Sequence, residues 1–206
     1  NIHRKDIVTE VTQSGYQQDY QQIAMQMMDC RTCSDWMEIY RRLVKWELEL
    51  SDTDSSMTEM LTMQKEEANI GFAKYIAKNY LDWVDPKNLG KVVEGKPVMS
   101  PDIFKTKLFP MLDKGEKVFL IVIDNFRYDQ WRSINSLLHG YYDVESEDFY
   151  CSILPTATQY ARNALFAGLM PLAIDKIMPD RWLNDNEEGG KNKYEEEFLM
   201  RQLQSS

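Results

Sequence analysis

The chain contains few residues that could cross-link it or form a metal site by themselves. Only three of its 206 residues are cysteines, and two of these form the short pattern Cys30-Arg31-Thr32-Cys33. A disulfide framework needs more pairs and a zinc site needs a second ligand pair, so we predict reduced structural thiols at a turn between helices. The two histidines, His3 and His139, lie far apart, and neither belongs to a metal-binding motif.

Long apolar runs and an excess of basic residues are also missing. No run approaches the roughly 20 apolar residues of a membrane span, and no signal peptide opens the chain, so we expect a cytoplasmic protein without membrane insertion. The formal net charge of -9 argues against a scaffold that grips nucleic-acid backbones through basic side chains. Cleavage of an oligonucleotide stays open, because metal ions would supply the positive charge in such a site.

The most informative segment is an apolar run that ends in a carboxylate. Residues Val118–Ile123 are all apolar, and Asp124 follows at once. Such a run is typical of a strand buried on both faces of a parallel sheet, and ligands bind at the carboxyl ends of such strands. Asp124 is therefore a candidate functional acid. A simple helix cap is the main alternative, whereas receiver, haloacid-dehalogenase and dinucleotide-binding folds each need a following loop that this sequence lacks.

A second motif, Leu154-Pro155-Thr156-Ala157-Thr158, predicts a turn that opens a helix with a hydroxyl at its start. A helix N-terminus favours negative charge and can hold a phosphate oxygen. A threonine hydroxyl becomes a competent nucleophile there when a divalent metal favours its alkoxide. Arg162, one turn along on the same side, could pair with a substrate phosphate or serve as a solvated or salt-bridged helix arginine.

Together, residues 123–131 (IDNFRYDQW) and 154–163 (LPTATQYARN) resemble the PglZ branch of the alkaline-phosphatase superfamily. This resemblance implies that Asp124 is a metal ligand and that Thr158 is both a metal ligand and the catalytic nucleophile. Thr156 is the alternative nucleophile, or a turn residue.

The same resemblance gives three candidate substrate-binding residues: Asn125, Arg127 and Arg162. Asn125 and Arg127 have a second interpretation, in which they only shape the turn into the next helix.

The helical region before these motifs, with WMEIY at 36–40 and WELEL at 46–50, is similar to PorX-type response regulators of type IX secretion. The resemblance implies a two-component response regulator whose PglZ output domain is a zinc-dependent phosphodiesterase or phosphatase acting on nucleotides or oligonucleotides. Its implied partners are a sensor kinase and secretion-system or transcription proteins. The alternative is a non-catalytic signalling and docking module, and the helical bundle is a candidate homodimer surface.

A complete site of this superfamily holds two zinc ions, with ligands from well beyond the nucleophile helix. Only 48 residues follow Thr158, and none of them is a histidine. We therefore expect the chain to be a fragment in which the zinc site is incomplete or empty. The intact parent would be the enzyme, and the fragment alone would be inactive.

For the fold, we predict an α/β class, with a parallel sheet and flanking helices preceded by an all-α three-helix bundle. Residues 1–85 would form the bundle, 86–97 a linker, and 98–206 the N-terminal part of the PglZ domain. Apolar residues at three- and four-residue spacing predict bundle helices from about Gly15 to Met28, from Ser34 to Leu50 and from Ser56 to Leu81.

The second region alternates predicted strands and helices, which implies a parallel sheet with right-handed crossovers. A short helix from Ser100 to about Leu112 comes first. The strands are Val118–Ile123 and Tyr142–Tyr150, and the later helices are Asp129–Leu138, one starting at Thr158, and Tyr194–Leu203.

Overall fold

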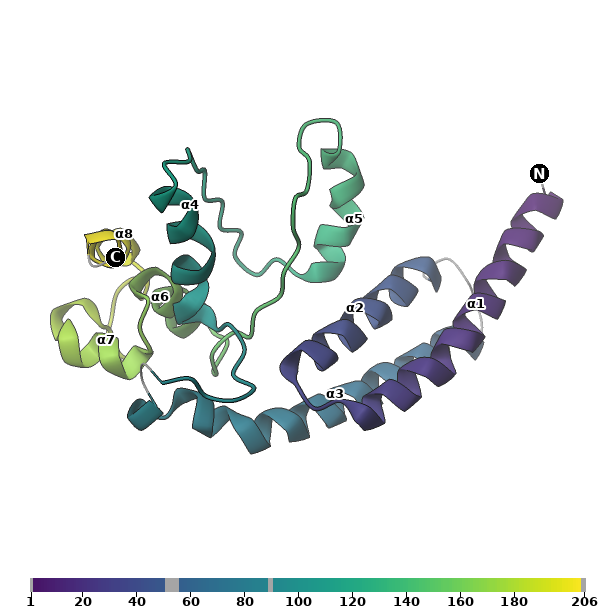
Figure 1. The fold of residues 1–206 in the computed structure, drawn as a ribbon, viewed down its shortest axis with the longest axis horizontal. Helices are drawn as coiled ribbons and strands as arrows, with labels where there is room; N and C mark the ends of the chain where they lie inside the picture. The colour runs from purple at the N-terminus through teal and green to yellow at the C-terminus, as the bar shows by residue number, and fades with distance from the viewer. Residues whose placement is uncertain (1, 51–55, 89–90, 205–206) are drawn as a thin grey trace. The chain divides into compact units, whose positions relative to one another are not determined.

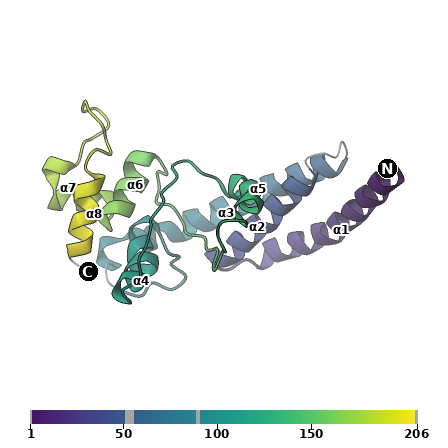
Figure 2. The ribbon, with the colours of Figure 1, turned by 90° about the horizontal axis from the view of Figure 1, so that it is seen from above.

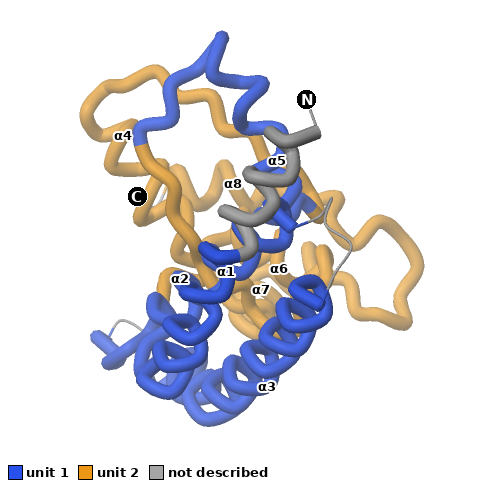
Figure 3. Tube along the Cα trace, turned by 90° about the vertical axis from the view of Figure 1, so that its right-hand side faces the viewer, with its two compact units in different colours: residues 1–96, 126–145 blue, residues 97–125, 146–206 orange. Residues whose placement is uncertain are grey.

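The computed structural model describes residues 2–50, 56–88 and 91–204, with side chains from residue 14 onward (Figure 1). The chain divides into two compact units, shown in different colours in Figure 3. Unit 1 comprises residues 1–96 and 126–145, and unit 2 comprises residues 97–125 and 146–206. The predicted domain boundaries at 85 and 98 stay a prediction. Residues 89–90 of the predicted linker lie outside the described residues. The side chain of His3 also lies outside them.

Unit 1 is built on three long helices, α1 (Ile2–Asp29), α2 (Cys33–Leu50) and α3 (Ser56–Val84), each of which contacts the other two (Figures 1 and 2). The predicted all-helical N-terminal region is therefore confirmed, and α1 begins earlier than predicted. The three helices share a buried core that includes Tyr16, Ile23, Ile39, Leu43, Trp46, Leu50, Met57, Leu61 and Ala68. Trp36 and Trp46 are 8% and 5% exposed, so both indole rings are buried.

Polar side chains fix how the three helices meet. The Tyr16 hydroxyl donates to Gln64 Oε1 at 3.3 Å, and Gln64 Nε2 donates to the carbonyl of Tyr20 at 2.9 Å. Trp46 Nε1 donates to Asp19 Oδ2 at 2.9 Å. Because an unsatisfied buried amide is costly, the fully buried Gln64 favours the one alignment of α1 and α3 in which it has both partners. Burial also raises the pKa of Tyr16 to about 12, so its hydroxyl stays protonated as a donor.

Two shorter helices complete unit 1, η1 (Pro86–Asn88) and α5 (Tyr128–Leu138). Helix α5 confirms the prediction of a helix over Asp129–Leu138, and His139 is its C-cap residue. The rings of Tyr40 on α2 and Tyr128 on α5 lie 5.9 Å apart, centre to centre. This aromatic contact joins a segment from the middle of the chain to the helical bundle.

The described part of unit 2 consists of short helices packed around small apolar clusters. Its helices are η2 (Ser100–Asp102), η3 (Phe104–Leu108), α4 (Phe109–Asp113), α6 (Thr158–Ala167), α7 (Pro171–Ile177), η4 (Pro179–Arg181) and α8 (Glu195–Gln204). Phe104, Phe109 and Leu165 form one cluster, and Ala167, Ile174, Trp182 and Phe198 form the other. Helix α6 takes part in both clusters, so it is the central element of the unit.

The predicted parallel sheet is wrong, and so is the α/β class. Most of the described residues are helical, and none of them forms a strand. The segment Val118–Ile123 runs as irregular chain with Phe119 94% and Ile121 79% exposed, and Tyr142–Tyr150 is also irregular. The described part has one isolated parallel bridge, between Met99 and Cys151. A strand exists only where a second strand pairs continuously with its N–H and C=O groups, and the described residues form no such continuous ladder along either segment.

No helix in the ranges described above is both long and apolar enough to cross a bilayer.

Candidate functional site

The structure brings Asp124 and Thr158 together, although no sheet connects them. Thr158 is the first residue of α6, and its Oγ1 donates to Asp124 Oδ2 at 3.4 Å. This distance is longer than the usual 2.5–3.0 Å of an O–H···O hydrogen bond, so the bond is weak. The Asp124 side chain is 48% exposed. Two oxygens of different residues, 34 positions apart in sequence, therefore converge at a place that ligands can reach.

Helix α6 positions the threonine. It starts after Ala157, the N-cap residue, whose methyl side chain accepts no hydrogen bond from the first turn. It ends at Gly168, which has a φ of 63°, the left-handed conformation that commonly terminates helices. Thr158 thus lies at the helix start as predicted, but it does not cap the helix. Its hydroxyl points to Asp124 instead.

Arg162 contacts the same carboxylate. Its Nη1 donates to Asp124 Oδ2 at 3.3 Å, and its Nη2 donates to Glu195 Oε2 at 2.5 Å. The hydrogen bond to Glu195 is the main reason that the pKa of Arg162 lies above its ordinary value, with a smaller contribution from Asp124. In the structure, Arg162 is therefore the salt-bridged helix arginine, with its charge shared between two acids.

Several polar residues that the sequence did not single out support this end of α6. Asn192 Nδ2 donates to the carbonyl of Thr158 at 3.2 Å and to Asn163 Oδ1 at 3.1 Å. Asn163 in turn donates to the carbonyl of Lys191 at 3.0 Å, and Glu195 follows at the start of α8. Each of these partners lies about 30 residues along the chain from the α6 residue that it contacts, so no local pattern could have revealed it.

The remaining predicted site residues have local roles in the structure. Asn125 has a φ of 55°, a left-handed conformation that asparagine adopts more readily than most residues. Arg127, in unit 1, pairs with Asp129 at 2.7 Å, and this pairing lowers the pKa of Asp129 and raises that of Arg127. Thr156 is exposed in the turn before α6. These observations agree with the turn-shaping interpretation of Asn125 and Arg127 and leave their substrate-binding role a prediction.

The donor atoms of the site fit a divalent cation in type but not in number. A carboxylate oxygen and a hydroxyl oxygen are both suitable ligands, yet tetrahedral zinc takes four. Among the described residues, no group of three or more histidine, cysteine, aspartate or glutamate side chains could hold a metal ion. Arg162 also competes for Asp124 Oδ2. A metal bound here would need further ligands besides Asp124 and Thr158, and would displace the arginine from the carboxylate.

Comparison with known families gives two matches. Residues 6–84 match the PorX response regulator linker domain, and residues 103–206 match the BREX system PglZ alkaline phosphatase-like domain. None of the curated proteins matches the chain. The second match covers half of the sequence, so the chain belongs to the PglZ alkaline phosphatase-like family. It combines a phosphatase-like domain with the linker domain of a response regulator, which confirms both resemblances seen in the sequence.

Proposed function

We propose that the PglZ domain of this protein is a zinc-dependent phosphodiesterase or phosphatase in which Thr158 is the nucleophile and Asp124 a metal ligand. One observation carries the proposal: Thr158 Oγ1 lies 3.4 Å from Asp124 Oδ2 at the first turn of α6, within a domain of the alkaline phosphatase-like family. A hydroxyl and a carboxylate in this position match what metal-assisted nucleophilic catalysis requires.

Asp124 and Thr158 would help to hold a divalent cation, whose charge would lower the pKa of the threonine hydroxyl and offset the charge of the substrate. Thr158 loses its proton to solvent, and its Oγ1 attacks phosphorus. A bond forms between this oxygen and phosphorus, the bond from phosphorus to the leaving oxygen breaks, and the leaving group takes a proton from water. Water then cleaves the phosphothreonine ester, releasing the phosphate product and restoring the hydroxyl. The first turn of α6 favours the negative charge throughout.

Arg162 is the residue proposed to bind the substrate phosphate. It already holds Asp124 at 3.3 Å, and it is anchored by Glu195 at 2.5 Å. A guanidinium group has donors on several edges, so Arg162 can keep its contact with Glu195 while exchanging Asp124 for a phosphate oxygen. Asn125 and Arg127 are proposed as further substrate contacts, on the resemblance alone.

The wider role follows from the linker domain. We propose that the protein is a cytoplasmic response regulator that acts on nucleotides or oligonucleotides and regulates type IX secretion, with a sensor kinase and secretion or transcription proteins as partners. The match of residues 6–84 to the PorX linker domain supports the response-regulator part of this proposal. Homodimerisation through the helical bundle is proposed on the resemblance alone.

Turnover of bis(p-nitrophenyl) phosphate by the full-length protein tests the catalytic assignment. We expect Thr158→Ala to abolish turnover while the protein stays folded, because the weak hydrogen bond it removes contributes about 1 kcal/mol or less. Thr156→Ala, the matched control two residues earlier, should retain most activity. Asp124→Asn should lose both bound zinc and turnover, whereas Asp113→Asn should keep both.

Full activity in Thr158→Ala combined with loss in Thr156→Ala would move the nucleophile to Thr156. If neither change affects turnover while zinc stays bound, the domain serves as a docking module and the catalytic proposal fails.

A further inference from the structure

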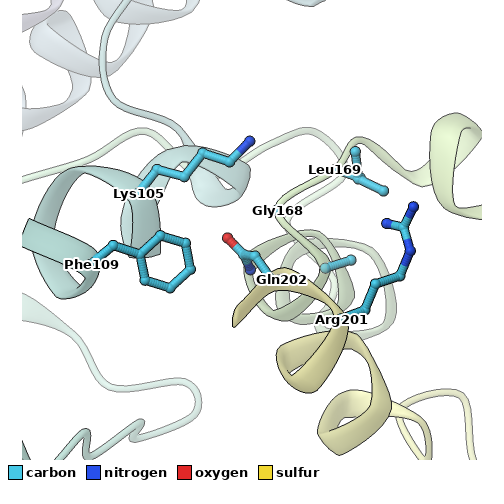
Figure 4. A pocket seen from close by; sticks show the side chains of 7 residues that line it. Lys105, Phe109, Gly168, Leu169, Arg201 and Gln202 are labelled. Carbon is cyan, nitrogen blue, oxygen red and sulfur yellow. The ribbon is translucent and has the colours of Figure 1, made fainter. Parts of the chain in front are cut away.

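Unit 2 contains a pocket that the proposed catalytic site does not use. It has a volume of about 250 Å³ and lies at the C-terminal end of α6, around Gly168 (Figure 4). The lining residues are Lys105, Phe109, Ala167, Gly168, Leu169, Arg201 and Gln202. Thr158 is at the other end of this helix, roughly 15 Å away at 1.5 Å per residue, so the two places are separate.

Gln202 forms the polar part of the pocket. Its side chain is 4% exposed, and its Nε2 donates to the carbonyls of Leu165 at 3.2 Å and Phe166 at 2.8 Å. The last carbonyls of a helix carry partial negative charge, which disfavours a bound anion. The amide of Gln202 covers two of them. The amide N–H groups of Gln202 therefore offset part of the negative field at this helix end.

Gly168 allows this arrangement. It has a φ of 63°, and a Cβ atom at this position would lie 2.5 Å from Gln202 Oε1. A side chain would therefore displace Gln202. The backbone of Gly168 instead forms part of the pocket wall.

Two cationic side chains reach the pocket from separate elements, Lys105 from η3 and Arg201 from α8 (Figure 4). The position of Arg201 in the last turn of α8 is favourable in itself, because a cation stabilises the C-terminal end of a helix. Lys105 comes from a segment almost 100 residues earlier, so both cations line one pocket only because the chain folds back on itself. Two positive charges at one small pocket also contrast with the net charge of -9 of the chain.

The rest of the lining is apolar. Phe109 and Ala167 are 7% and 5% exposed, and Leu169 is half-buried beside them. The volume lies below the about 300–1,000 Å³ typical of pockets for drug-sized ligands. The chemistry is therefore that of a site for a small molecule with one charged and one apolar part.

We propose that this pocket binds a small organic anion, with its carboxylate or phosphate group held by Lys105 and Arg201 and its apolar part against Phe109 and Leu169. Charge-assisted hydrogen bonds from both cations would hold the anionic group, and burial of the apolar part would favour an organic anion over a bare inorganic one.

Titration of the ¹⁵N-labelled 206-residue chain, followed by amide NMR shifts, tests this proposal. Benzoate and phenyl phosphate represent the two kinds of anionic group, inorganic phosphate lacks the apolar part, and benzylamine inverts the charge. We expect saturable shifts at Gly168 and Leu169 with benzoate, phenyl phosphate or both, weaker ones with inorganic phosphate and none with benzylamine. Shifts around Thr158 would report the other site and are scored separately.

Lys105→Gln and Arg201→Gln should each weaken binding about tenfold, the effect of losing one charge-assisted contact. Lys176→Gln, which removes an exposed lysine of α7 that does not line the pocket, should bind like the wild type. The proposal is overturned if neither organic anion shifts Gly168 and Leu169 up to about 10 mM. It is equally overturned if benzylamine binds as well as benzoate, or if Lys105→Gln binds as the wild type does.

Discussion

At the scale of single residues, Arg162 connects the candidate nucleophile to the rest of unit 2. It contacts Asp124 on one side and Glu195 on the other, while Asp124 also accepts from Thr158. The side chains of Arg162 and Glu195 are 31% and 16% exposed, so solvent screens this pair less than a surface pair. Through its hydrogen bond to Nη2, Glu195 helps to hold the guanidinium group of Arg162 beside Asp124.

We predict that Glu195→Gln lowers the free energy of unfolding by about 1–2 kcal/mol, between the small effect of exposed pairs and the larger effect of buried ones. Chemical denaturation of the single variants and of Glu195→Gln combined with Arg162→Gln measures the coupling between the two side chains. Additive effects of the two substitutions would show that the ion pair contributes nothing to stability.

The sequence identified the two central residues of the candidate site but not the residues that support them. The apolar run before Asp124 and the turn before Thr158 identified two residues that the structure places 3.4 Å apart. Glu195 and Asn192 were missed, because their contacts with α6 depend on how a distant segment folds back. Their sequence surroundings, a polar stretch followed by three glutamates, gave no indication of these contacts.

At the scale of elements, helices were predicted well because their signals are local. The periodic apolar residues of α2 and α3 are visible within one segment, and the same residues form the core of unit 1. Strands depend on a partner elsewhere in the chain, and the segment Val118–Ile123 has none among the described residues. Helix α7, with seven residues, is too short to show a clear period.

The start of α2 shows how a local motif stabilises an element. Asp35 Oδ2 accepts from the backbone N–H groups of Thr32 at 2.7 Å and Arg31 at 2.9 Å, and Thr32 Oγ1 accepts from the N–H of Asp35 at 3.2 Å. This reciprocal pattern satisfies N–H groups that a helix start leaves unpaired. The backbone hydrogen bond from Arg31, followed by those from Thr32, lowers the pKa of Asp35 below its usual 3.8.

A carboxyl group whose pKa is lowered in the folded state stabilises the protein above its unfolded pKa, and that stabilisation is lost as the pH falls through the folded pKa. We predict that Asp35→Ala lowers the free energy of unfolding by about 1 kcal/mol at pH 7, a value discounted for exposure. The difference from the wild type should shrink as the pH falls below about 3.8. Glu66→Ala, which removes an exposed carboxylate from α3, is the matched control. If Asp35→Ala lowers the free energy of unfolding equally at all pH values, the lowered pKa of Asp35 does not contribute to stability.

At the scale of the whole molecule, the chain joins a linker domain of response regulators to an alkaline phosphatase-like domain. Among its described residues, the candidate site offers two possible ligand side chains, those of Asp124 and Thr158, whereas tetrahedral zinc takes four ligands. The family assignment indicates a hydrolase.

We predict that the isolated 206-residue chain binds zinc weakly and shows no turnover of bis(p-nitrophenyl) phosphate, because two ligands do not form a closed site. Zinc titration by calorimetry and a turnover assay on the same sample measure both properties. Stoichiometric zinc together with turnover in this chain would refute the argument from ligand count.

A trapped covalent intermediate would show whether Thr158 attacks phosphorus. Full-length protein is mixed with bis(p-nitrophenyl) phosphate, quenched in acid during turnover and digested, and its peptides are examined by mass spectrometry for a phosphorylated threonine. Wild-type protein should carry the p-nitrophenyl phosphoryl or phosphoryl group on Thr158, and Thr158→Ala should carry none. A modification on Thr156 instead, or wild-type turnover by Thr158→Ala, would contradict the assignment.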